Sequence, residues 1–113
     1  MTATRTAAEV GRANRRAGRE LERAAQVALE GAGWFVLRTG PGQAGVVDLV
    51  AIGVRPFRVA MIQCKVNGYV APEHRRQLLA LKRDFKMHPV VATWEKPAKG
   101  PRHVTFRNLE DET

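Results

Sequence analysis

Two apolar, β-branched runs that follow each other closely constrain the fold more than any other feature of the chain. They are Val46–Ile52 and Arg58–Val66, and a short turn containing Pro56 separates them. Runs of this kind are typical of buried strands, and a turn this short joins two strands only as an antiparallel hairpin. We therefore expect these two strands to lie side by side in the interior of a sheet.

Both runs carry polar residues where a buried strand should have none. Asp48 lies in the first run and is the only acidic residue between Glu30 and Glu73. Gln63 and Lys65 lie in the second run, two positions apart, so they should point to one face of the sheet. A buried carboxylate is costly unless it is paired or bound to a cation. An acid on one strand with an amide and a lysine on the next favours a metal-dependent phosphodiesterase.

The remaining elements follow from apolar periodicity and from Gly and Pro punctuation. The expected elements are a helix over 14–30, a strand over 34–38, a loop over 39–45, a helix over 72–86, and strands over 89–94 and 103–107. The order α-β-β-β-α-β-β predicts an α/β fold, a mixed sheet of about five strands flanked by helices. We expect a flexible basic arm over residues 1–13, one domain over 14–109 and an acidic tail over 110–113.

Charge points to a polyanionic partner. The 113 residues carry a net charge of +8, and residues 31–109 hold thirteen Lys or Arg against four Asp or Glu. This balance favours nucleic acid, with a soluble protein that is merely basic as the alternative. No apolar run approaches the ~20 residues of a membrane span, and the N-terminus lacks an apolar signal core, so we expect a cytoplasmic protein without a membrane partner. The single cysteine excludes an internal disulfide.

Phosphodiester hydrolysis assisted by Mg²⁺, or by Mn²⁺ as a substitute, needs oxygen ligands, a positioned water and a cation. We expect Asp48 to be the main metal ligand, with the Gln63 side-chain oxygen and the main-chain carbonyl of Cys64 beside it. Lys65 would orient the water or stabilise the transition state. Glu20, near the core-facing edge of the first helix, is the expected further carboxylate.

Each of these residues also has a purely structural interpretation. Asp48 could pair with Arg38 or Lys65, Lys65 could extend to solvent, and Gln63 could be an ordinary polar residue of an edge strand. Glu20 could be one of many solvated charges on a helix. Cys64 alternates with Gln63, so it should face the opposite side of the sheet as a small buried hydrophobe.

Four segments carry a family resemblance that extends from about Arg12 to Phe106, which is nearly the whole domain. They are Arg16–Glu22, Arg38-Thr39, Val47–Ala51 and Gln63-Cys64-Lys65. In this order they resemble the PD-(D/E)xK nuclease superfamily, and within it the archaeal-type Holliday junction resolvase family with its bacterial and phage relatives. Two departures stand out. Gln63 occupies the place of the usual Glu, which removes one negative charge from the metal site, and Val47 stands where the superfamily often has Pro.

The resemblance implies a restriction-endonuclease-like core and a structure-selective endodeoxyribonuclease. The substrate would be a four-way DNA junction, nicked symmetrically by a homodimer. It also implies that Arg38 and Thr39 contact DNA or the active site, although Thr39 could simply cap the strand end.

Clustered arginines suggest where the DNA backbone is held. A phosphate-gripping arm would be formed by Arg12, Arg15, Arg16 and Arg19, while a solvated helix face is the alternative. Arg75 and Arg76, early in the second helix, could also reach phosphates. Nothing in the sequence resembles a base-reading element, so we expect recognition by shape and charge.

Three rival functions stay open. The first is a restriction or repair nuclease acting on other DNA structures. The second is a catalytically inactive DNA-binding module, with Gln63 as the mark of lost activity. The third is a basic RNA-binding or ribosome-associated protein. Phage and cellular origins are equally compatible with the sequence.

Overall fold

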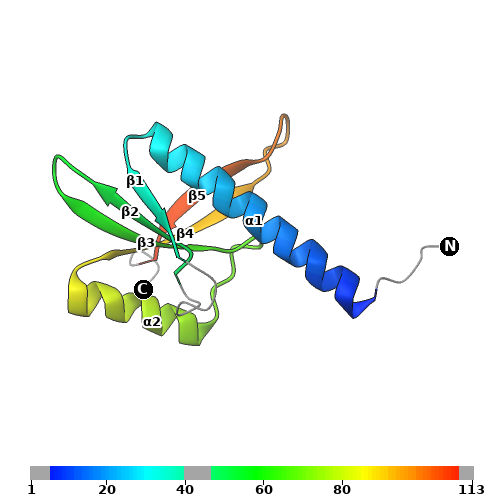
Figure 1. Ribbon diagram of the computed structural model, residues 1–113, viewed down its shortest axis with the longest axis horizontal. Helices are drawn as coiled ribbons and strands as arrows, with labels where there is room; N and C mark the ends of the chain where they lie inside the picture. The colour runs from blue at the N-terminus through cyan, green and yellow to red at the C-terminus, as the bar shows by residue number, and fades with distance from the viewer. Residues whose placement is uncertain (1–5, 40–46, 110–113) are drawn as a thin grey trace.

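The protein forms one mixed five-stranded sheet with a helix on each face, as Figure 1 shows. The computed structural model describes residues 6–39 and 47–109. Its elements are α1 (Ala7–Gly31), β1 (Phe35–Arg38), β2 (Leu49–Gly53), β3 (Arg58–Cys64), α2 (Pro72–Phe85), β4 (His88–Glu95) and β5 (His103–Asn108). This order confirms the α/β fold expected from the sequence. The strands follow one another across the sheet in chain order, from β1 to β5.

The expected hairpin is confirmed as the β2–β3 pair. These strands are antiparallel, with Leu49 opposite Ile62 and Ala51 opposite Ala60. The pair formed by β3 and β4 is parallel, while β1–β2 and β4–β5 are antiparallel. Two parallel neighbours need a crossover connection, and α2 supplies it. The ends of β2 and β3 that carry the predicted polar residues thus lie within the sheet rather than at its edge.

Helix α1 begins at Ala7 rather than at the expected Asn14. The hydroxyl oxygen of Thr6 accepts a hydrogen bond from the main-chain N–H of Glu9 at 3.1 Å, which caps the helix. The sequence Thr6-Ala-Ala-Glu9 has the spacing of a capping box, a start signal that outweighs the small polar composition of this segment. Residues 7–13 of the predicted arm are therefore helical, whereas residues 1–5 and the predicted acidic tail lie outside the described residues.

The C-terminal half of α1 packs on one face of the sheet. Leu21, Ala25 and Leu29 recur every four residues and are buried, and the last two belong to a cluster that includes Leu49 and Ile62. One buried side chain per turn forms a single apolar stripe along the helix. The N-terminal half extends past the sheet, and Figure 1 shows it projecting from the domain. The molecule is accordingly elongated, with extents of 55 × 32 × 28 Å.

Helix α2 covers part of the opposite face. Its Leu78 is fully buried against Val91 of β4 and Leu109 beyond β5. On the same face Phe35 and Leu37 of β1 remain 62% and 47% exposed. The face that α2 occupies is thus covered near β4 and open near β1. In the part of the chain that the structure describes, no helix combines the length and apolar character that a membrane crossing needs.

Candidate active site

Asp48 directly precedes β2 and is fixed from both its side chain and its main chain. Its Oδ2 accepts a hydrogen bond from the main-chain N–H of Cys64 at 2.7 Å, and its own N–H donates to the carbonyl of Ile62 at 2.8 Å. The side chain therefore caps the end of β3. In a strand the N–H and C=O of one residue point to the same side. The carbonyl of Cys64 is thus directed toward the side of β3 on which Asp48 lies.

Thr39 holds the main chain that leads into Asp48. The N–H of Thr39 donates to the carbonyl of Asp48 at 3.2 Å, and its hydroxyl lies 2.6 Å from the carbonyl oxygen of Val47. These contacts give Thr39 the capping role that was its alternative interpretation, and the predicted DNA contact stays a prediction. Residues 40–45 of the predicted loop lie outside the described residues. The effect of Thr39 is to tie the end of β1 to the start of β2.

Gln63 is 1% exposed and lies on the face covered by α2. Its Nε2 is 3.5 Å from Nδ1 of His74, while its Oε1 is buried without a hydrogen-bond partner among the described residues. Cys64 packs instead against the cluster beneath α1, which confirms that it faces the opposite side of the sheet. A buried amide oxygen without a partner is unfavourable, so this atom is available to a ligand.

Lys65 comes immediately after the last residue of β3. Its N–H donates to the carbonyl of Ala92 at 2.9 Å. Its side chain lines a surface hollow with Asn14 and Ala17 of α1, so its neighbours differ from those of Gln63. We predicted that Gln63 and Lys65 share one face of the sheet because side chains alternate along a strand. Lys65 lies beyond the last residue of β3, so this alternation does not fix its direction.

The carboxylate that accompanies Asp48 is Glu22 rather than the predicted Glu20. Burial and the negative charge of Asp48 raise the pKa of Glu22, while Arg38 and Arg19 lower it. Glu20 instead forms an ion pair with Arg102, with 3.1 Å between Oε2 and Nη2, and its side chain is 51% exposed. The structure thus brings Glu22 to Asp48 and turns Glu20 to the other side of α1.

Glu22 could not be identified from the sequence. The buried stripe of α1 has a polar edge on each side, and the sequence does not show which edge faces the site. Leu21, Ala25 and Leu29 form the stripe. Glu20 lies along one edge and Glu22 along the other, so both satisfy helical spacing equally well. A signal that could have identified Glu22 is Gln26, a polar residue one turn further along the same edge of the helix. The Oε1 of Gln26 accepts a hydrogen bond from Nε of Arg38 at 2.7 Å. A polar pair on one edge marks the side that faces the end of β1.

The charges of Asp48 and Glu22 affect the pKa values of neighbouring groups. Burial raises the pKa of Asp48, against the opposing effects of the Cys64 N–H and the charge of Lys65. Burial, Asp48 and Glu22 together raise the pKa of the Cys64 thiol to about 12, so it is a neutral side chain and a poor nucleophile. Two carboxylates thus act on one thiol from the sheet and from α1.

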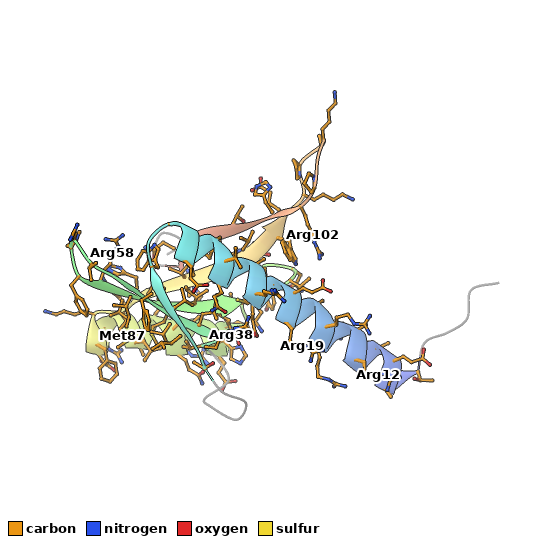
Figure 2. The ribbon with its side chains drawn as sticks, turned by 45° about the horizontal axis from the view of Figure 1, so that its top comes forward. Arg12, Arg19, Arg38, Arg58, Met87 and Arg102 are labelled. Atoms are coloured by element: carbon orange, nitrogen blue, oxygen red, sulfur yellow. The ribbon has the colours of Figure 1, made fainter. Side chains whose placement is uncertain are left out.

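The predicted DNA-binding arginines lie on two elements. The four on α1 are exposed, and Figure 2 shows Arg12 on the projecting half of the helix and Arg19 closer to the sheet. Arg75 and Arg76 lie in the first turns of α2, directly after His74. His74 contacts Gln63, so Arg75 and Arg76 follow a residue that touches β3. Of the four arginines on α1, Arg19 lies close enough to Glu22 to lower its pKa.

The residues present fit a hard divalent cation through oxygen atoms. Among the residues that the structure describes, no three His, Cys, Asp or Glu side chains gather as a metal cluster. The negative charge of Asp48 nevertheless raises the pKa of Glu22, and the buried Gln63 Oε1 has no hydrogen-bond partner among the described residues. A cation beside the two carboxylates would relieve the charge effect, and an amide oxygen is a donor that such a cation accepts. Carboxylate, amide and main-chain oxygens are the donors that Mg²⁺ and Mn²⁺ accept.

A mixed five-stranded sheet with a helix on each face agrees with the restriction-endonuclease-like α/β core expected from the sequence. A similar solved structure is that of Hjc, a Holliday junction resolvase from the archaeal hyperthermophile Archaeoglobus fulgidus. The two chains superpose with a TM-score of 0.61 over 82% of this chain and 73% of that one, at 23% sequence identity. No family model and no curated protein matches the sequence. The likeness therefore establishes the fold, and the activity has to be argued from the site.

Proposed function

We propose that the protein is a metal-dependent endodeoxyribonuclease whose substrate is a four-way DNA junction. The observation that carries the proposal is the anchored Asp48 carboxylate, 2.7 Å from the Cys64 N–H, with Glu22 and Lys65 within electrostatic reach. The surrounding basic charge suits a polyanionic substrate. The similarity to a solved resolvase supports the choice of a branched substrate.

Asp48, the Oε1 of Gln63 and the main-chain carbonyl of Cys64 would hold Mg²⁺, with Glu22 as the further carboxylate. The bound cation would polarise the phosphate and lower the pKa of a water ligand. The Cys64 N–H fixes one oxygen of Asp48, so the other oxygen is held in a defined direction. Gln63 contributes a donor without charge, which gives a less negative site than one with Glu in its place.

Lys65 supplies the positive charge that the chemistry needs. Its ammonium group lies close enough to Asp48 to favour the ionised carboxylate. In the proposed reaction it stabilises the charge that develops on the phosphate, or it orients the attacking water. Arg38, held by Gln26 and near Glu22, provides a second positive charge on the side of α1.

Symmetric cutting of a junction needs two active sites, and we propose that a homodimer supplies them. The apolar surface that carries Phe35 and Leu37 supports this, because exposed apolar patches mark association sites. Each protomer would cut one strand of a symmetric junction. Nothing else in the proposed chemistry depends on dimer formation.

The test is cleavage of a labelled four-way junction in Mg²⁺ and in Mn²⁺, with a linear duplex of the same arm sequence beside it. We expect paired, symmetric nicks in the junction alone, and their loss in Asp48→Ala. Cleavage of both substrates would keep a nuclease of restriction or repair type and remove the resolvase. Tight junction binding without cleavage by either protein would favour the inactive DNA-binding module, and Gln63 would be its cause.

A further inference from the structure

A basic hollow opens on the side of α1 that carries Glu20. Its lining residues share positive charge, apart from the single acid, and its volume is about 380 Å³. They are Arg16, Arg19, Glu20, Arg23 and Arg38. Four arginines that share one hollow with a single acid form an anion-binding surface, because guanidinium matches the geometry of phosphate oxygens.

Glu20 is held away from the sheet by a fifth arginine. Arg102, at the base of the hairpin that joins β4 and β5, pairs with Glu20 at 3.1 Å and stacks over the ring of Trp94 at 4.1 Å from its centroid. Figure 2 shows Arg102 at the root of this hairpin. Both partners of the pair are about half exposed. An exposed ion pair of this kind contributes little to stability, so folding alone does not require an acid in this place.

The hollow adjoins the candidate active site. Arg19 and Arg38 line it, and the same two arginines lie close enough to Glu22 to favour its ionised form. The hollow and the candidate active site therefore share two arginines at their border. The chain offers one continuous basic path from the projecting half of α1 to the site.

We infer that this hollow binds a backbone phosphate of the DNA substrate, and that Glu20 occupies the place of this phosphate when DNA is absent. The carboxylate keeps the like-charged arginines from repelling one another, and the phosphodiester then displaces it. Arg102, released from Glu20, becomes a further phosphate contact. The inference rests on the proposed function only in taking DNA as the ligand.

An unusual consequence follows for Glu20. A carboxylate that competes with phosphate weakens DNA binding, so its removal should strengthen binding. A catalytic carboxylate behaves in the opposite way, because its loss abolishes cleavage and leaves binding largely intact. The neutral and nearly isosteric change Glu20→Gln separates these roles.

The experiment measures the binding of a fluorescent four-way junction by anisotropy in EDTA, over a range of salt concentrations. It compares the wild type with Glu20→Gln, Arg102→Ala, and the double variant. Glu30→Gln is the matched control, since it removes an exposed charge from the same helix outside the hollow. We expect Glu20→Gln to bind about threefold to tenfold more tightly and with a steeper salt dependence, while Glu30→Gln changes binding less than about twofold. Part of this gain in affinity should disappear in the double variant, because Arg102 is no longer there to contact the phosphate.

Cleavage by the same proteins in Mg²⁺ keeps this inference distinct from the proposed function. If the wild type cuts the junction but Glu20→Gln binds no more tightly than Glu30→Gln, the inference is overturned and the function stands. Tighter binding by Glu20→Gln without cleavage by any protein would keep the phosphate site and remove the nuclease. Loss of cleavage by Glu20→Gln at unchanged affinity would make Glu20 catalytic and would also overturn the inference. A thermal melt of each variant confirms that it is folded.

Discussion

The two sides of α1 differ sharply although they are built from neighbouring residues. On one side Glu22 is partly buried beside Asp48, and on the other Glu20 is half exposed among arginines. The buried stripe through Leu21 lies between them and turns the two acids to different neighbours. The same residue type, two positions apart on one helix, is thus proposed to bind a metal ion on one side and to compete with a DNA phosphate on the other.

The largest expected effect is a difference in cleavage rate between variants of Glu22 and of Glu20. Glu22→Gln should lower the rate of junction cleavage by at least about 100-fold, because it removes a proposed metal-binding carboxylate. Glu20→Gln should change the rate at saturating enzyme by less than about threefold. Single-turnover kinetics in Mg²⁺ measures both. If Glu20→Gln were the inactive variant, the assignment of the two sides would be reversed.

The next largest effect concerns metal binding by Gln63, on the side of α1 where Glu22 lies beside Asp48. Gln63→Glu adds a negative ligand where a buried amide oxygen has no hydrogen-bond partner among residues 6–39 and 47–109, so Mn²⁺ should bind about tenfold more tightly. Isothermal titration calorimetry without DNA gives the affinity independently of activity. Gln77→Glu, an exposed change on α2, is the matched control and should leave the affinity unchanged. Equal or weaker Mn²⁺ binding by Gln63→Glu would remove Gln63 from the metal site.

The smallest expected effect concerns stability in EDTA. Because the pKa of Asp48 is raised in the folded protein, its ionisation costs the folded state more than the unfolded chain. The stability linked to this group is complete below its ordinary value of 3.8 and is lost as the pH rises through the folded value. Asp48→Asn, which keeps an acceptor for the Cys64 N–H, should therefore raise Tm at neutral pH by less than about 4 °C.

This stability gain should disappear in acid, where Asp48 is protonated in both states, and should turn into a loss when Mg²⁺ is added. Asp84→Asn is the control of opposite sign, since the hydrogen bond from Arg83 lowers the pKa of Asp84. Differential scanning fluorimetry across pH measures both variants. A lower Tm for Asp48→Asn in EDTA at neutral pH would show that the Asp48 charge is already compensated within the protein.

Most of the fold could be predicted because strand composition and turn length act locally. The runs around Asp48 and Gln63 were predicted as an antiparallel hairpin, and the structure confirms this pairing. The start of α1 was missed although Thr6 and Glu9 have capping-box spacing, because a two-residue signal is easily outweighed by composition over a longer window.

The site was less predictable because it depends on how α1 is rotated about its axis. Helical spacing identifies the buried stripe but not which edge faces β2, so Glu20 and Glu22 could not be separated. His74 was missed for a related reason. It meets Gln63 only because α2 begins beside the end of β3, and no spacing in the sequence encodes that contact. Contacts within one strand pair were thus readable, whereas contacts between layers were not.

The clasp that Thr39 makes with Val47 and Asp48 has a consequence for how this protein can change. Thr39 follows the last residue of β1, and its hydrogen bonds reach the main-chain carbonyls of Val47 and Asp48, directly before β2. These contacts hold the Asp48 main chain against the end of β1, while the Cys64 N–H holds its carboxylate against β3. A substitution at Thr39 can therefore shift the Asp48 carboxylate without replacing any of the proposed metal-binding groups.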